Sequence, residues 1–124
     1  MKKRHNFREL MIWERSMRLV KQVYEVTKGF TKEERFGLTN QIRRAAVSVP
    51  SNIAEGCGRG TDPQLIQYLN IDHGSLCELE TQLILSKELS FLKEEPLIDL
   101  TNEINQLQKM VLKLIDKLNQ WKAD

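Results

Sequence analysis

The last third of the chain carries the pattern that most restricts the fold, a regular alternation of three- and four-residue spacings between apolar residues. The residues on this apolar stripe are Leu97, Leu100, Ile104, Leu107, Val111, Leu114, Leu118 and Trp121. The spacing matches an α-helix, so it predicts one helix over about residues 96–121 with a single apolar side. Such a helix is stable in water only when other elements cover that side.

Three further segments show helical spacing and can supply that cover. They are predicted over about 9–28, 32–56 and 62–89, with the stripes Trp13, Met17, Val20, Tyr24, Thr27, then Leu38, Ile42, Ala46, Val49, Ile53, and then Leu65, Leu69, Leu76, Leu79, Leu83. Two of the starts carry capping signals, a capping box at Thr31 and Glu34, and Thr61 or Asp62 ahead of Pro63. Four such helices with short connections predict that all 124 residues form one all-α domain, an antiparallel up-down-up-down four-helix bundle.

Pro50 lies in the middle of the second predicted helix, within the stretch "QIRRAAVSVPSNIAEGCGRG". A proline removes one backbone hydrogen bond and crowds the carbonyl four residues earlier, here that of Ala46. We therefore predict a helix that is kinked at Pro50, with Ser48 and Ser51 bonding to the freed backbone groups. The small residues on either side would let another helix approach closely, so we interpret this segment as an element of packing and assembly.

The first two predicted helices carry more apolar surface than one face of a bundle needs. On each of them a second stripe lies beside the first, and the residues predicted to face another subunit are Ile12, Leu19, Val23, Val26, Val47, Pro50, Ala54 and Cys57. Contiguous apolar patches of this kind usually mark an interface. One alternative is a wide face that packs against two neighbours within the same chain. We favour self-association into a closed, symmetric homo-oligomer.

Charged residues also fall where the third helix is expected to meet the core. Asp72 lies on the apolar stripe and Glu80 beside it, and a buried charge without a partner is costly. The expected partners on the second helix are Arg43, Arg44 and Asn52. Gly74 lowers helix stability and so suggests a close helix crossing. We favour a buried polar network that fixes helix register, with a functional pocket and plain solvent exposure as alternatives.

Motifs for catalysis or for cofactor binding do not occur in the sequence. Its two histidines, His5 and His73, lack the Glu-x-x-His spacing of di-iron bundles, and Cys57 and Cys77 lack metal-ligand spacing. There is no phosphate-binding loop or nucleophile elbow, and no apolar run reaches the roughly 20 residues of a membrane span. The sequence thus predicts a reduced, cytoplasmic, non-enzymatic protein with no cofactor, metal, small-molecule substrate or membrane partner.

Positive charge is concentrated in the first half of the chain. Residues 1–60 hold 13 Lys and Arg against 6 Asp and Glu, whereas residues 61–124 hold 6 against 11. This asymmetry indicates either a basic face for phosphates or two halves that attract each other. The residues predicted to contact nucleic acid are Lys2, Lys3 and Arg4 in a flexible basic arm over 1–8, and Arg43, Arg44 and Arg59.

The stretches "RRAAVSVPSNIAEGCGR" and "YLNIDHGSLCELETQL" resemble the 23S ribosomal-RNA intervening-sequence proteins. The positions that match the pattern of this family are Gln41, Arg43, Arg44, Ala45, Ser48, Pro50, Asn52, Ile53, Ala54, Glu55, Gly56, Arg59, Gly74, Ser75, Glu78 and Glu80. Phe7, Leu10 and Trp13 match its opening, so the resemblance covers nearly the whole chain. Asp72 and His73 depart from the pair usual there, which weakens any basic contact inferred for the third helix.

The resemblance implies a bacterial four-helix bundle that assembles as a ring, usually described as a pentamer. A more distant similarity to the accessory subunit of diversity-generating retroelements, which acts with RNA and a reverse transcriptase, suggests RNA association by analogy. We therefore predict a homo-oligomer that binds RNA or a ribonucleoprotein through arginines of its first half. The alternative is a protein–protein interaction scaffold that self-assembles without nucleic acid.

Overall fold

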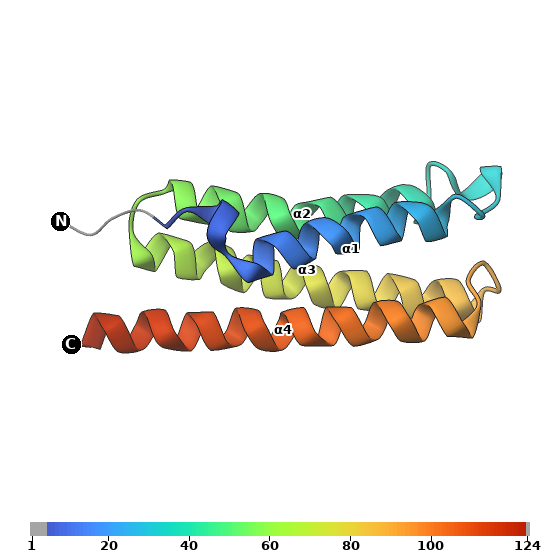
Figure 1. Ribbon diagram of the computed structural model, residues 1–124. Coiled ribbons are helices and arrows are strands. Elements are labelled where there is room, and N and C mark those ends of the chain that lie inside the picture. Colours follow the sequence, from blue (N-terminus) through green and yellow to red (C-terminus); the bar gives the residue numbers. More distant parts are fainter. Residues whose placement is uncertain (1–4, 124) are drawn as a thin grey trace.

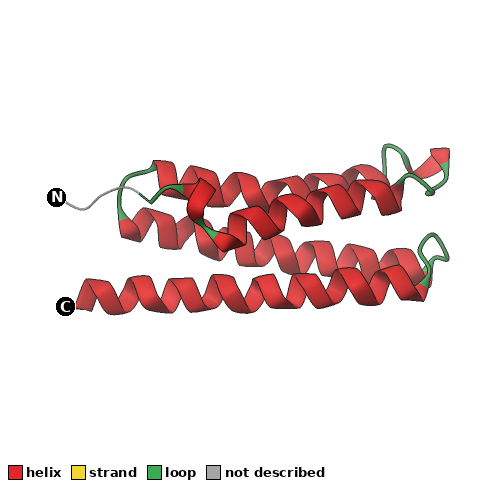
Figure 2. Cartoon of the chain, in the orientation of Figure 1, coloured by secondary structure: helices red, strands yellow, loops and turns green. Residues whose placement is uncertain are grey.

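Four long helices dominate the computed structural model, which describes residues 5–123 (Figures 1 and 2). They are α1 (Met11–Thr27), α2 (Leu38–Gly58), α3 (Asp62–Glu88) and α4 (Glu94–Ala123), with the 3-10 turns η1 (Phe7–Glu9) and η2 (Lys32–Glu34). Within the described residues every element is helical and none is a strand. The prediction of an all-α four-helix bundle is confirmed.

The helices run up-down-up-down, as short connections require. The α1–α2 and α3–α4 connections lie at one end of the bundle, and the α2–α3 connection lies at the other (Figure 1). Each helix packs against its two neighbours around the bundle, with α1 closing on α4. The apolar stripes of α3 and α4 meet inside as predicted, and Leu76, Leu79 and Leu107 have no exposed surface.

The starts of α3 and α2 differ in how well the sequence predicted them. The Thr61 hydroxyl accepts a hydrogen bond from the Gln64 amide at 3.4 Å, so it caps α3 as one of the two expected residues. The predicted start of the second helix near residue 32 is wrong, because Thr31 makes no side-chain cap and α2 begins only after Gly37. The turn η2 takes the place of the first helical turn. Phe36 consequently lies outside both elements and is 87% exposed.

Within α2, Pro50 is accommodated without a break in the helix. The helix is continuous from Leu38 to Gly58, and the Ser48 hydroxyl donates to the Ala45 carbonyl at 2.6 Å. That bond ties the side chain to the turn that precedes the proline. The bend at Pro50 stays a prediction.

The core takes in apolar residues that were predicted to face another subunit. Ile12, Leu19, Val23 and Cys57 are at most 4% exposed, so their assignment to an interface is wrong. Pro50 is also buried. On α1 the stripe that keeps surface is the one predicted to be internal, since Trp13 and Val20 are half-buried and Met17 and Tyr24 are exposed, although its last member Thr27 is buried. The two stripes of α1 therefore exchange the roles predicted for them.

The buried side of α1 carries two hydroxyl groups, and both are satisfied locally. The Ser16 and Thr27 hydroxyls each donate to a backbone carbonyl of the preceding turn at 2.8 Å. A hydroxyl bonded in this way costs little to bury. Of the predicted interface, Val26 and Ala54 are half-buried and Val47 is 40% exposed.

Close packing between α2 and α3 occurs at Gly56 rather than at Gly74. A Cβ added to the buried Gly56 would lie 2.8 Å from the Cβ of Tyr68. Gly74 is exposed, and nothing described lies within 4 Å of a Cβ added there. The predicted crossing at Gly74 is wrong, and Gly56 is the residue that lets the two helices approach.

The described residues before α1 pack on the bundle. His5 Nε2 lies 3.0 Å from Asp62 Oδ1, and the ring of Phe7 meets that of Trp13 edge-on, with centroids 5.2 Å apart. The prediction of a flexible arm is therefore wrong for residues 5–8.

Candidate nucleic-acid interface

The polar residues of the second and third helices do not form the single network that the sequence predicted. Asp72 is fully buried, and neither of its carboxylate oxygens has a hydrogen-bond partner among the described residues. Burial raises the pKa of Asp72 to about 8, so its carboxyl group is mostly neutral at pH 7. The predicted pairing of Asp72 with Arg43, Arg44 or Asn52 is wrong.

Arg43 is held against α1 instead. Its Nε donates to Thr27 Oγ1 at 2.8 Å and its Nη2 donates to the Tyr24 carbonyl at 3.4 Å. The guanidinium carbon lies 4.5 Å from the centroid of the Tyr24 ring. Stacking and hydrogen bonding together orient the guanidinium, and most of its N–H groups remain available to a ligand.

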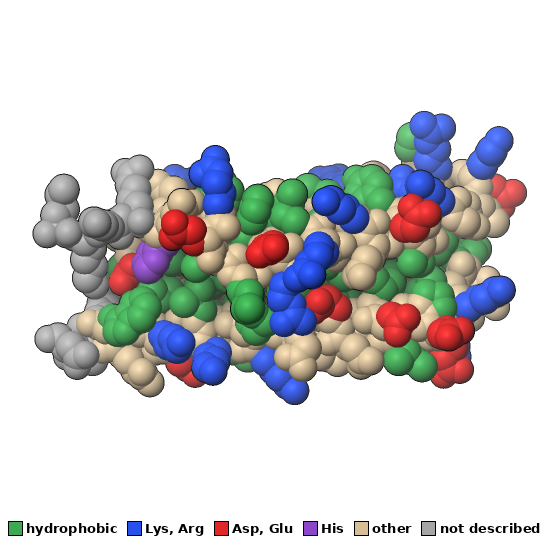
Figure 3. All heavy atoms as spheres, viewed as in Figure 1, with side chains coloured by type: hydrophobic (Ala, Val, Ile, Leu, Met, Phe, Trp, Pro, Cys, Tyr) green, Lys and Arg blue, Asp and Glu red, His purple; other side chains and the backbone are tan. Residues whose placement is uncertain are grey.

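Arg43 is part of a groove beside the α1–α2 connection, which we call the arginine groove. Its lining includes Arg35, Arg43, Arg44, Tyr24 and Phe36 around a volume of about 640 Å³, and no Asp or Glu lines it. Phe36 and Tyr24 are 87% and 40% exposed, and the Arg35 guanidinium lies 5.6 Å from the Phe36 ring centroid. Figure 3 shows Lys and Arg side chains, with some acids nearby, at this end of the bundle. Cations beside exposed rings suit phosphates and unstacked bases.

A second groove lies between α2 and α3, and we call it the polar groove. It has a volume of about 370 Å³ and shares Arg44 and Ser48 with the arginine groove. From α3 it adds Ser75, Glu78 and Gln82. The members of the predicted network that the structure brings together here are Gln41, Arg44, Ser48, Ser75 and Glu78. Gln82, which sequence reasoning missed, has a buried Oε1 without a donor among the described residues.

Arg59 lies at the other end of α2 and is already engaged. Its Nη2 donates to Glu55 Oε1 at 3.0 Å and to the Tyr68 hydroxyl at 2.7 Å. The arginines predicted to contact nucleic acid therefore lie in two separate places. Arg43 and Arg44 share the arginine groove, and Arg59 does not reach it.

Other predicted site residues lie elsewhere. Glu80 accepts a hydrogen bond from Gln108 Nε2 at 3.3 Å, which links α3 to α4. Asn52 is half-buried on α2. Lys2, Lys3 and Arg4 lie outside the described residues, so their predicted contacts have no structural account.

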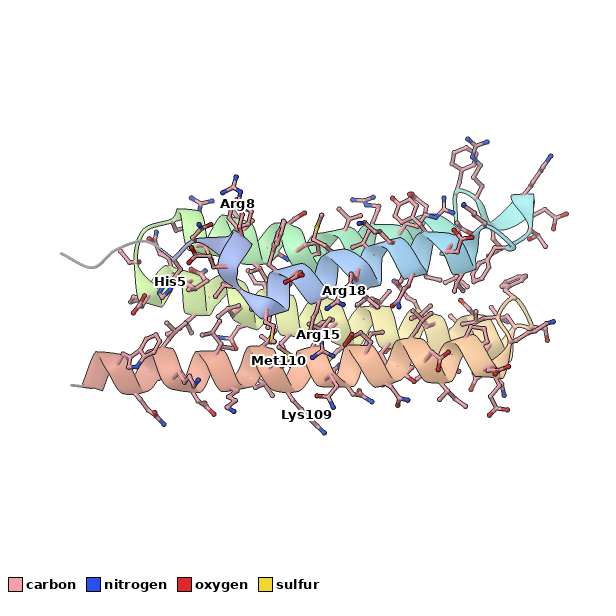
Figure 4. The ribbon with its side chains drawn as sticks, in the orientation of Figure 1. His5, Arg8, Arg15, Arg18, Lys109 and Met110 are labelled. Carbon is pink, nitrogen blue, oxygen red and sulfur yellow. The ribbon has the colours of Figure 1, made fainter. Side chains whose placement is uncertain are left out.

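A basic face on α1 and α4 is a weaker candidate because acids are interleaved with its cations. Figure 4 shows Arg15 on α1 pointing toward Met110 on α4, and Arg15 Nη1 lies 3.3 Å from Met110 Sδ. The other arm of Arg15 pairs with Glu103. The shallow groove that Arg15 and Arg18 line also includes Glu14 and Glu103, so its charges balance. The positive charges of the arginine groove are not balanced in this way, because no Asp or Glu lines it.

Sequence reasoning missed Tyr24, Arg35 and Phe36 as members of the site. Tyr24 was assigned to a core stripe, and Arg35 and Phe36 to the first turns of the second helix. One signal was present, because Phe36 stands between Arg35 and Gly37 and belongs to no apolar stripe. An aromatic residue with no place in a core is a candidate for surface recognition.

Neither a metal site nor a bilayer-crossing segment is indicated within residues 5–123. No group of three or more His, Cys, Asp or Glu in this part of the chain is placed to hold an ion. None of its helices combines the length and the hydropathy that crossing a membrane requires.

Comparison with known proteins adds a family and a fold relative. The model of the family described as 23S rRNA-intervening sequence protein matches residues 8–113. Comparison with curated proteins gave no match. Among solved structures, the chain is similar to a protein of unknown function from the S23 ribosomal protein family of Bacteroides thetaiotaomicron, with a TM-score of 0.78 and 22% sequence identity. The match covers 85% of this chain and 98% of that one, and at this identity it shows a shared fold.

Proposed function

Because the chain belongs to the 23S rRNA-intervening sequence protein family, we propose that it is a non-enzymatic, homo-oligomeric RNA-binding protein that holds single-stranded RNA in the arginine groove. The observation that carries this proposal is the lining of the groove, three arginines beside two exposed aromatic rings with no acid among them. Guanidinium groups neutralise phosphates, and exposed rings stack on unpaired bases. The family description, which refers to 23S rRNA, supports RNA as the nucleic acid.

Binding of a phosphate at Arg43 should cost little side-chain conformational entropy. Arg43 is already oriented by Thr27 and Tyr24, so it can meet a phosphate without ordering a long side chain first. The exposed Asn40 also lines the groove. Its amide can bond the ribose 2′-hydroxyl, which distinguishes RNA from DNA.

Removing Arg35 and Arg44 from the groove tests the proposal. We expect the double variant Arg35→Ala, Arg44→Ala to bind a short single-stranded RNA about 10- to 100-fold more weakly, since each lost phosphate contact is worth roughly tenfold. The slope of log affinity against log salt should fall by about 1.4. Fluorescence anisotropy across a series of KCl concentrations measures both quantities. No hydrogen bond or ion pair of the described residues involves either side chain, so the Tm should change little.

Arg59→Ala is the control for loss of a positive charge outside the groove, because it removes an arginine at the far end of α2 that is bound to Glu55 and Tyr68. It should leave RNA affinity within about twofold of wild type. An equal loss in this control, or a wild-type protein that does not bind RNA at low salt, would contradict the proposal. The same titration with single-stranded DNA tests the preference for RNA.

The oligomeric part of the proposal is supported by an apolar groove between α1 and α2. Met17 and Val20 of α1 line it with Val47, Pro50 and Ala54 of α2, around about 340 Å³. Met17 is 37% exposed and Val47 is 40% exposed. We propose that a second copy of the chain covers this groove. Val47 also lines the arginine groove, so self-association would set RNA sites beside subunit boundaries. One RNA that reaches two such sites would bind more tightly than it binds either site alone.

A charge placed in the apolar groove should separate the subunits. We expect Met17→Glu to reduce the mass measured by light scattering to that of one chain, 14.5 kDa, because an unpaired carboxylate would be buried at the interface. Met11→Glu is the control, since Met11 is also on α1 and is 66% exposed outside this groove. A single-chain mass for the wild type at micromolar concentration would overturn the oligomer. A wild-type oligomer that binds no RNA would instead favour the interaction-scaffold alternative.

A further inference from the structure

The arginine groove and the polar groove adjoin along α2, and this continuity extends the proposed function. Arg44 and Ser48 line both grooves. A single strand bound in the arginine groove can therefore continue along α2 into the polar groove. The following inference rests on the proposed binding of RNA.

The two sides of the polar groove offer opposite hydrogen-bonding groups. Glu78 and Gln82 lie one turn apart on α3, so acceptor oxygens stand on the same face of that helix. Arg44 presents donors from α2. No ion pair joins Arg44 to Glu78, and neither side chain has another partner within the described part of the chain. Opposite charges that share a groove without pairing leave room for a ligand that needs both.

The base that matches this arrangement is guanine. Its Watson–Crick edge carries two adjacent donors, the N1–H and the N2 amino group, followed by the O6 acceptor. A carboxylate accepts two parallel N–H bonds, and a guanidinium donates to a carbonyl oxygen. None of the other bases has these two adjacent donors: adenine has a lone pair at N1 and a C2–H where guanine has its amino group, cytosine has lone pairs at N3 and O2, and uracil has an N3–H beside the O2 lone pairs, so a carboxylate could not accept two N–H bonds from any of them.

We propose that the polar groove selects an unpaired guanine, with Glu78 accepting from N1–H and N2–H and with Arg44 donating to O6. The arginine groove then supplies affinity for any sequence, and the polar groove supplies the choice of base. Recognition of this kind suits single-stranded RNA, whose Watson–Crick edges are free. When a base other than guanine occupies the groove, the Glu78 carboxylate loses water without gaining both hydrogen-bond donors. This cost is the expected source of the preference for guanine.

A set of four short RNAs tests this inference by fluorescence anisotropy. An oligouridine is compared with versions that carry one central guanosine, inosine or adenosine. We expect the guanosine RNA to bind about 10- to 100-fold more tightly than the adenosine RNA. Inosine lacks only the N2 amino group, so its RNA should fall between them.

Glu78→Gln should abolish the preference for guanosine and leave the affinity for oligouridine within about threefold, because the amide offers a donor where a second acceptor is needed. Glu88→Gln is the matched control, since Glu88 lies on α3 away from both grooves and the same charge is removed. That control should raise all four affinities slightly and equally. Binding of all four RNAs with equal affinity would overturn guanine selection, and a guanosine preference that survives Glu78→Gln would overturn its assignment to Glu78; either outcome leaves RNA binding in place. Absence of binding to every RNA would overturn both.

Discussion

Replacing Asp72 with asparagine is expected to remove a large part of the fall in unfolding free energy between about pH 5 and pH 8. Asp72 is fully buried without a partner among the described residues, and burial raises the pKa of its carboxyl group from 3.8 to about 8. In this range the folded protein keeps a proton that the unfolded chain has released. The unfolding free energy should therefore fall by up to about 1.4 kcal/mol per pH unit as the pH rises.

The sign of this effect follows from the raised pKa of the folded state. The stabilising contribution is complete below the unfolded pKa near 4, and it is lost as the pH rises through the folded pKa near 8. Over three pH units the loss approaches about 4 kcal/mol, a large share of the stability of a domain of this size. The amide side chain of the Asp72→Asn variant cannot ionise, so the curve of the variant should be flatter by this amount.

Urea unfolding at pH 5, 6, 7 and 8 measures the effect, at one protein concentration because the proposed self-association would also contribute to stability. Asp116→Asn is the control, because Asp116 is exposed on α4 and should leave the wild-type pH dependence unchanged. If wild type and Asp72→Asn give parallel curves, the Asp72 carboxyl group is not held in the neutral form by the fold.

The architecture was predictable because each helix repeats its apolar residues at helical spacing. That spacing identifies stripes but does not say which of two adjacent stripes faces inward. On α1 the stripe with Ser16, Leu19 and Val23 was predicted to face another subunit. It is buried instead, with the Ser16 hydroxyl bonded to its own backbone at 2.8 Å, and the larger Met17 and Tyr24 of the other stripe keep surface. Only the packing of α1 against α2 and α4 resolves this choice.

The sequence predicted two arginines of the candidate site but not the residues that surround them. Arg43 and Arg44 stand out in the sequence, and both line the arginine groove. Whether Arg43 meets Asp72 or Thr27 depends on the rotation of α2 about its axis, which a periodic pattern leaves uncertain by a fraction of a turn. Phe36 was missed because a helix was expected across it, whereas Gly37 separates η2 from α2.

The closest approach of α2 and α3 gives a second large expected effect, from a single added methyl group. Gly56→Ala should destabilise the protein by about 1–3 kcal/mol, although alanine favours a helix, because the backbones must separate or distort. The new Cβ would lie 2.8 Å from Tyr68 Cβ and 3.0 Å from Leu65 Cδ1. The Tyr68 Cβ is fixed to the α3 backbone and cannot swing away as the end of a long side chain can.

Gly74→Ala adds the same methyl group on the exposed side of α3, where nothing described lies within 4 Å. It should stabilise the protein by about 0.5–1 kcal/mol, through helix propensity alone. Urea unfolding of the two variants should therefore shift in opposite directions from wild type. If both variants were stabilised, α2 and α3 would have room for a methyl group at Gly56. The contact at Gly56 would then not fix the register that sets Arg44 and Ser48 of α2 against Glu78 of α3. Opposite shifts would instead assign to Gly56 the close packing that holds the two walls of the polar groove together.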